Sequence, residues 1–150
     1  MFKTIAKRRA KGLFEALNRG DHEAMLEDVA EDVHHVFPGD HPLGGERHSR
    51  EAMRRWFRRL DALFPELEFE VKQVSVSGPP WDMAIAVEWA DRGKAADGVP
   101  YENEGAHWIR IRRGKGVYVH AYLDTEKVSE SCRRMAAAGI EEAAAAPITS

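Results

Sequence analysis

The spacing of apolar residues changes at Pro65, and this change constrains the fold more than any other feature. Over residues 50–64 the apolar side chains recur every three or four positions, as in a helix with one buried face. Beyond Pro65 they alternate, as Leu67, Phe69 and Val71 do, which is typical of a strand with one buried face. Helices gathered before this point and strands gathered after it predict an α+β fold, in which the helices cover one face of a bent antiparallel sheet and a cavity lies between them.

Capping and turn residues set the expected boundaries. Asp21 and Ser49 are residue types favoured at helix N-termini, and proline or glycine follows the expected ends. In chain order we expect helices over residues 3–18, 22–29 and 50–64, strands over 32–37, 67–76 and 83–89, a hairpin over 105–124, and a C-terminal helix from Thr125. The alternation slips at Lys72 and Gln73, which predicts a β-bulge there.

Length and composition indicate one domain in a reducing compartment. The 22 Lys and Arg nearly balance the 25 Asp and Glu, so we expect neither a nucleic-acid nor a membrane partner. A single cysteine, Cys132, excludes an intrachain disulfide, and no segment approaches the roughly 20 apolar residues of a membrane span. We therefore expect a cytoplasmic protein with one domain over residues 1–136. The alanine-rich tail, 137–150, has little to bury and is expected to fray or to dock on a partner.

The basic N-terminus, residues 1–11, has two interpretations. It contains no acidic residue, as in a targeting peptide, but Ala6, Ala10 and Phe14 form one apolar stripe of a helix. We favour the helix packed on the domain.

The register of the hairpin decides which side chains enter the cavity, and two registers compete. A two-residue loop, Gly114–Lys115, sets Ile109 opposite His120 and His107 opposite Tyr122, all on one face. A three-residue loop instead turns the alternate residues of the second strand inward, since a one-residue slip exchanges the faces. We favour the first register. It leaves an outer apolar face as a surface for a homodimer, made by Val117, Val119, Ala121 and Leu123.

Asp124, which ends the hairpin, also has two interpretations. A carboxylate beside an apolar cavity has a raised pKa and is suited to act as a general base. The same residue immediately precedes Thr125 at a helix start, where Asp is a favoured cap.

Several segments of the chain resemble SnoaL-like proteins of the nuclear transport factor two-like superfamily. The resemblance is carried by Phe14-Glu-Ala-Leu-Asn-Arg-Gly-Asp21, Asp32-Val-His-His-Val-Phe-Pro-Gly39, Pro42-Leu-Gly-Gly45, Arg50-Glu-Ala-Met53, Trp56-Phe-Arg-Arg-Leu60, His107-Trp-Ile-Arg-Ile-Arg112, Gly114-Lys115 and Tyr122-Leu-Asp124. It implies a cone-shaped, strongly bent sheet wrapped around a long helix, an apolar pocket and usually a homodimer.

The same resemblance implies a place for chemistry but no particular reaction. In the cyclase-like members an acid at the end of the last strand is the general base, and Asp124 matches that position. Relatives also include ketosteroid isomerases, epoxide hydrolases and domains with no catalysis.

These arguments together predict the site. Asp124 is the expected base, and Tyr122 or His107 the donor that stabilises a developing oxyanion. The expected pocket residues are His120, Asn103, Tyr101, Ile109, His35, Phe37, Trp56, Phe57 and Trp89. We expect no cofactor and no metal, because the histidines show no recognisable ligand spacing.

Three classes of function remain open: an isomerase- or cyclase-like enzyme that removes a proton next to a carbonyl of a small apolar substrate, a non-catalytic binder of a small hydrophobic ligand, and a dimeric interaction domain. The three differ in whether an acid and a donor border an open cavity, or whether side chains fill that space.

Overall fold

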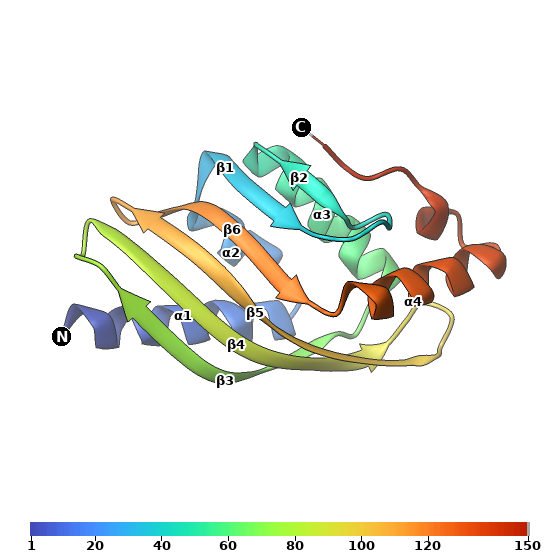
Figure 1. Cartoon of the computed structure of the whole chain (residues 1–150), viewed down its shortest axis with the longest axis horizontal. Helices are drawn as coiled ribbons and strands as arrows, with labels where there is room; N and C mark the ends of the chain where they lie inside the picture. The colour runs from blue at the N-terminus through green and yellow to red at the C-terminus, as the bar shows by residue number, and fades with distance from the viewer. Residues whose placement is uncertain (150) are drawn as a thin grey trace.

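The predicted α+β architecture is confirmed by a computed structural model, which describes residues 1–149 (Figure 1). The elements in chain order are α1 (Phe2–Asn18), α2 (His22–Glu27), β1 (Val29–Phe37), β2 (Gly45–Arg47), α3 (Arg50–Leu63), β3 (Glu68–Ser77), β4 (Asp82–Lys94), β5 (Pro100–Arg112), β6 (Lys115–Leu123), α4 (Thr125–Ala137) and the 3₁₀ helix η1 (Glu141–Ala144). None of the described helices is long and apolar enough to cross a membrane.

The six strands form one curved sheet in the order β2-β1-β6-β5-β4-β3 (Figure 1). Neighbouring strands are antiparallel except β1 and β6, which run parallel. The expected bulge lies on β3 between Val71 and Gln73, so that prediction is confirmed. α1, α2 and α3 lie on the inner face of the sheet, and the apolar stripe of α1 is buried at Ala6, Ala10 and Phe14.

Local capping explains where the inner helices begin. The Ser49 hydroxyl accepts a hydrogen bond from the Ala52 amide at 3.1 Å, and the Asp21 carboxylate accepts one from the Ala24 amide at 3.3 Å. These bonds satisfy amides that would otherwise lack a partner in the first turn. Capping at Ser49 and the stop at Pro65 hold α3 in place, with Trp56 and Phe57 buried against the sheet.

The favoured register of the hairpin is wrong. Arg112 pairs with Lys115 around a two-residue turn whose central residues, Arg113 and Gly114, have φ of 51° and 80°, as a type I′ turn requires. The register then shifts between Arg110 and Ile111, which leaves Val117 as an extra residue on β6.

This shift exchanges the two faces of β6. Ile109 pairs with Val119 and His107 with Ala121, so the apolar residues face inward and Ala121 is 0 % exposed. His120 and Tyr122 lie across from Trp108 and Ala106 on the outer face, where Tyr122 is 53 % exposed. The predicted dimer surface of Val117, Val119, Ala121 and Leu123 is therefore wrong, because Val119 and Ala121 belong to the core and Leu123 packs against it.

The C-terminal tail packs on the domain itself, contrary to the expectation that it frays or docks on a partner. Ala143 and Ile148 are buried, and the Arg59 guanidinium donates to the Ala146 carbonyl and to the Glu142 carboxylate, both at 2.7 Å. Figure 1 shows the tail returning from α4 to the side of β2 and α3. We call residues 141–149 the C-terminal strap.

Candidate functional site

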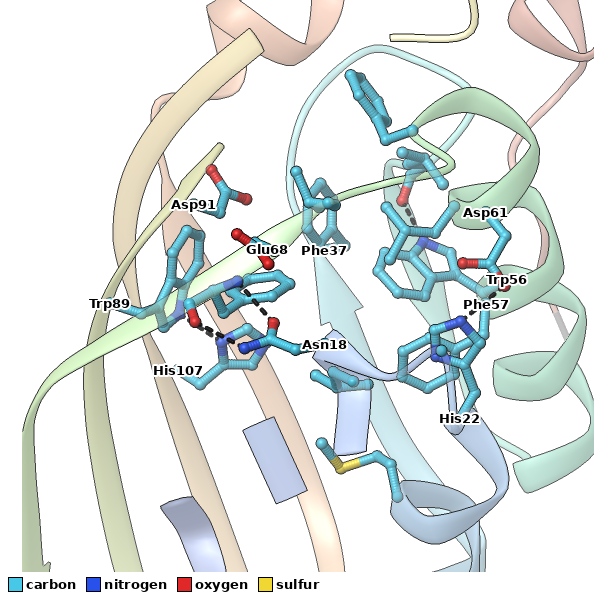
Figure 2. A pocket seen from close by; sticks show the side chains of 18 of the residues that line it. Asn18, His22, Phe37, Trp56, Phe57, Asp61, Glu68, Trp89, Asp91 and His107 are labelled. Atoms are coloured by element: carbon cyan, nitrogen blue, oxygen red, sulfur yellow. Dashed lines mark hydrogen bonds and ion pairs between the residues drawn. The ribbon is translucent and has the colours of Figure 1, made fainter. Parts of the chain in front are cut away.

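A cavity of about 540 Å³ lies between the inner face of the sheet and the inner helices. Aromatic side chains make much of its wall: Phe37, Trp56, Phe57, Phe64, Phe69 and Trp89. In Figure 2 Trp89, Asp91 and His107 lie on the sheet side, while Trp56 and Phe57 face them from α3. A cavity of this size and lining accommodates a small, largely apolar molecule.

His107 enters this cavity from β5 as a neutral ring with a fixed tautomer. The Trp89 indole N–H donates to His107 Nδ1 at 2.7 Å. Because an indole nitrogen is only a donor, Nδ1 must accept and the ring proton must be on Nε2. Burial lowers the pKa of His107 to about 4, with a smaller effect from His120, so the ring stays uncharged at neutral pH. The ring therefore offers a donor and no charge.

His35, on β1, is neutral and fixed in the same way by a different partner. The Arg47 guanidinium donates to His35 Nδ1 at 2.6 Å, and a guanidinium has no acceptor, so the proton of this ring is also on Nε2. Burial lowers the pKa of His35 well below its usual value, and the nearby positive charge of Arg47 lowers it further. The ring packs edge-on against Trp56 and lines the cavity.

Asp91, near the end of β4, is a buried acid in the cavity wall. Asp91 is only 5 % exposed, and within residues 1–149 its Oδ1 atom has no hydrogen-bond partner. Burial raises the pKa of Asp91 to about 7, against a smaller lowering by the Asn103 backbone amide. At neutral pH this carboxyl is thus present in both protonation states.

Tyr101 provides a hydroxyl near Asp91. The Asn103 side-chain amide donates to Tyr101 Oη at 3.0 Å and to the Asp124 carbonyl at 2.9 Å, so the tyrosine accepts and keeps its own proton for donation. Burial raises the pKa of Tyr101, and the Asp91 carboxylate raises it further. Tyr101 is therefore a neutral donor next to a titrating acid.

The structure brings most of the predicted pocket residues together. The cavity is lined by His35, Phe37, Trp56, Phe57, Trp89, Tyr101 and His107. Asn103 is buried and holds Tyr101, whereas Ile109 lines a second, smaller cavity beside α1. His120 and Tyr122 lie outside, stacked on each other with ring centroids 4.0 Å apart.

The predicted position of Asp124 in the cavity is wrong. Asp124 is exposed, and its carboxylate accepts a hydrogen bond from the Glu126 amide at 3.1 Å, as the N-cap of α4. The capping interpretation is therefore correct, because the α4 amides provide partners at the surface. With Asp124 and Tyr122 outside, the predicted catalytic group loses its base and one of its two donors.

Asp91 was missed although a signal for it existed. Met83, Ile85, Val87 and Trp89 alternate along β4, and Asp91 continues that inward parity by one more step. The strand predicted from the sequence ends at Trp89, whereas β4 continues to Lys94. A polar residue at an inward position of a strand indicates a site when the strand is followed far enough.

A metal site is not evident in the described part of the chain. No group of three or more His, Cys, Asp or Glu side chains within residues 1–149 is arranged to hold an ion.

Comparison with known proteins identifies relatives of this fold. The family described as SnoaL-like domain matches residues 10–119. A solved NTF2-like protein of unknown function from Burkholderia pseudomallei is 23% identical, with 83% of this chain and 94% of that chain covered and a TM-score of 0.74. No curated protein matches the chain.

Two solved structures described as putative polyketide cyclases are also similar. The SnoaL-like protein from Jannaschia sp. is 16% identical, with 86% and 92% of the two chains covered and a TM-score of 0.71. The protein from Xanthomonas campestris is 23% identical, with 81% and 94% covered and a TM-score of 0.58. At these sequence identities the similarity shows a shared fold and no shared reaction.

Proposed function

The chain belongs to the SnoaL-like domain family, and from this premise we propose that it is an isomerase- or cyclase-like enzyme in which Asp91 transfers a proton next to a carbonyl of a small apolar substrate. The observation that supports this proposal most is the Asp91 carboxyl, which borders an aromatic cavity, has an Oδ1 atom without a partner in the described chain, and has a pKa raised to about 7. An acid–base group works best when its pKa is close to the working pH.

The proposed reaction needs only groups that border the cavity. The Asp91 carboxylate removes a proton from the carbon next to the carbonyl, and the negative charge that develops on the carbonyl oxygen accepts a hydrogen bond from the Tyr101 hydroxyl. The protonated Asp91 then returns the proton to another carbon of the same substrate, so that protons balance over the cycle. The aromatic part of the lining lowers the local dielectric constant, which strengthens both interactions.

A second candidate function is the non-catalytic binding of an apolar ligand. It is favoured by the way the polar groups of the cavity bind one another, with His107 held by Trp89 and His35 held by Arg47. A binder needs the cavity but not a titrating Asp91. The two candidates therefore differ in the effect of a substitution at Asp91.

Exchange of carbon-bound hydrogen for deuterium tests the proposal without knowledge of the natural product. A panel of cyclic ketones and β-diketones is incubated with the protein in D₂O and followed by NMR. We expect Asp91→Asn to lower the exchange rate at least about 100-fold, within the usual range for a general base. Asp124→Asn serves as a matched control, because it removes an exposed carboxylate outside the cavity, and is expected to keep the rate.

Two results would contradict this function. Exchange that persists in Asp91→Asn excludes Asp91 as the base. Binding of the panel compounds without exchange in the unmodified protein identifies a binder instead.

A further inference from the structure

Arg47 is a buried cation whose hydrogen-bond partners within residues 1–149 include no carboxylate. The residue is 0 % exposed, and its guanidinium donates to the carbonyls of Ile148 and Gly44, both at 3.1 Å, and to His35 Nδ1. Burial lowers the pKa of Arg47 to about 10, so the charge persists at neutral pH. A buried charge with no hydrogen-bonded carboxylate among these residues is costly, which makes an anion beside it favourable.

The charge of Arg47 reaches the cavity through His35. Arg47 and His35 are directly paired across β2 and β1, so both side chains point to the inner face. Because Nδ1 of His35 accepts from the cation, its Nε2–H is a polarised donor on a ring that lines the cavity. Arg47 itself acts only as a positioning residue behind this donor.

His107, whose ring proton is also on Nε2, adds a second neutral donor to the lining of the same cavity. Apart from the buried Asp91, the cavity-lining acids Asp61, Glu66 and Glu68 are exposed to solvent, whereas both histidine donors lie deeper. This wall of the cavity therefore attracts negative charge.

We propose that His35, backed by Arg47 and assisted by His107, binds a carboxylate of the substrate, which is therefore an apolar keto acid. The inference rests on the proposed function for the reacting carbonyl, which lies at Asp91 on β4. β4 is three positions from β1 in the sheet, so Asp91 and His35 lie on separate strands of the cavity lining, with His107 on β5 between them. The keto group reacts, and the carboxylate orients it.

Binding of two matched probes tests this proposal separately from catalysis. The probes are 2-naphthoate and 2-naphthamide, which have nearly the same shape and differ in charge. Titration calorimetry at pH 6 is done on the full chain carrying Asp91→Asn, so no turnover contributes. We expect naphthoate to bind at least about tenfold more tightly than naphthamide, as a hydrogen bond to a charged group implies.

Substitutions of the donor His35 and of Arg47 behind it show whether these residues cause the preference for naphthoate. In His35→Phe and in Arg47→Met the preference for naphthoate is expected to disappear while naphthamide affinity stays the same. His35→Gln keeps an N–H donor and is expected to restore part of the preference. If Arg47→Met does not fold, the two His35 variants decide the matter. Equal affinities for the two probes in the Asp91→Asn protein with His35 and Arg47 intact, binding of neither probe, or a preference that survives His35→Phe each overturns the proposal.

An independent signature shows whether Arg47 acts through the ring. The ¹⁵N chemical shifts of His35 are expected to report an accepting Nδ1 and a protonated Nε2, and Arg47→Met is expected to release a mixture of tautomers. A ring that keeps its tautomer without Arg47 contradicts the positioning role. Failure of the exchange assay with a retained naphthoate preference would refute the proposed reaction and leave the carboxylate site standing.

Discussion

Asp91 and Arg47 are both buried beside one cavity, but burial has different consequences for the two. A carboxyl can lose its charge by taking up a proton, and burial raises the pKa of Asp91 to about 7. A guanidinium keeps its charge, since the lowered pKa of Arg47 is still about 10, and it donates to three acceptors within residues 1–149. We call the cavity lining at Asp91 the Asp91 wall, and the lining at His35, which Arg47 contacts from behind, the Arg47 wall. The Asp91 wall has a variable charge, which suits proton transfer. The Arg47 wall has a permanent charge, which suits binding.

The largest expected effect on stability concerns the protonation of Asp91. Between about pH 4 and pH 7 the folded protein keeps the Asp91 proton, whereas the unfolded chain has lost it, because the folded pKa of about 7 exceeds the ordinary value of 3.8. The free energy of unfolding therefore falls as pH rises through this window, by up to about 4 kcal/mol. In Asp91→Asn this contribution to the decrease in the free energy of unfolding is absent. Urea denaturation at pH 4.5, 6 and 8 measures the difference between the two proteins.

The matched control is Asp124→Asn, whose exposed carboxylate lies outside the cavity. It is expected to keep the pH dependence of the unmodified protein. If Asp91→Asn shows the same slope as this control, Asp91 does not hold a proton at neutral pH, and the contrast between the two walls disappears.

The C-terminal strap is expected to have the next largest effect, at the Arg47 wall. Deleting residues 146–150 removes the Ile148 carbonyl that accepts from Arg47 and the buried Ile148 side chain. The lost hydrogen bond to a charged group and the lost apolar burial lower the free energy of unfolding by about 3 kcal/mol. Thermal and urea unfolding measure this loss.

Glu142→Gln tests whether the strap stabilises the fold through its ion pair with Arg59 or through its contacts with Arg47 and the core. The Glu142 side chain is 44% exposed in its ion pair with Arg59, so its removal is expected to cost less than about 1 kcal/mol. Equal losses for the deletion and for Glu142→Gln would show that Arg47 gains little from the strap.

An effect as small as that at Glu142 is expected at Asp124, which lies outside the cavity. Asp124→Ala removes the α4 cap and is expected to cost about 1 kcal/mol, whereas Asp124→Ser keeps a capping oxygen and most of the stability. Neither variant is expected to change ligand binding or exchange. A loss of exchange in Asp124→Ser as large as that in Asp91→Asn would return the catalytic role to Asp124.

The fold was predictable because its signals are local. Periodicity, the caps at Asp21 and Ser49 and the stop at Pro65 act within a few residues, and the β3 bulge appears as a slip in the alternation. The pocket aromatics Trp56 and Trp89 followed from the same periodicity.

The site was only partly predictable because its decisive features depend on distant contacts. The bulge at Val117 reverses the faces of β6, and no break in the apolar pattern indicates it, since Val117, Val119 and Ala121 alternate without interruption. The raised pKa of Asp91 depends on burial by other elements, and the burial of Arg47 depends on a carbonyl 101 residues further along the chain. Sequence spacing contains neither piece of information.

The most direct test of the central claim is the pKa of Asp91 in the intact protein. A ¹³C NMR titration of the aspartate side-chain carboxyls between pH 3 and pH 9 resolves each group, and Asp91→Asn assigns the resonance. We predict one carboxyl that titrates near pH 7 and is missing in the variant. An Asp91 that titrates below about pH 5, like an ordinary exposed aspartate, would contradict the assignment of proton transfer to this residue.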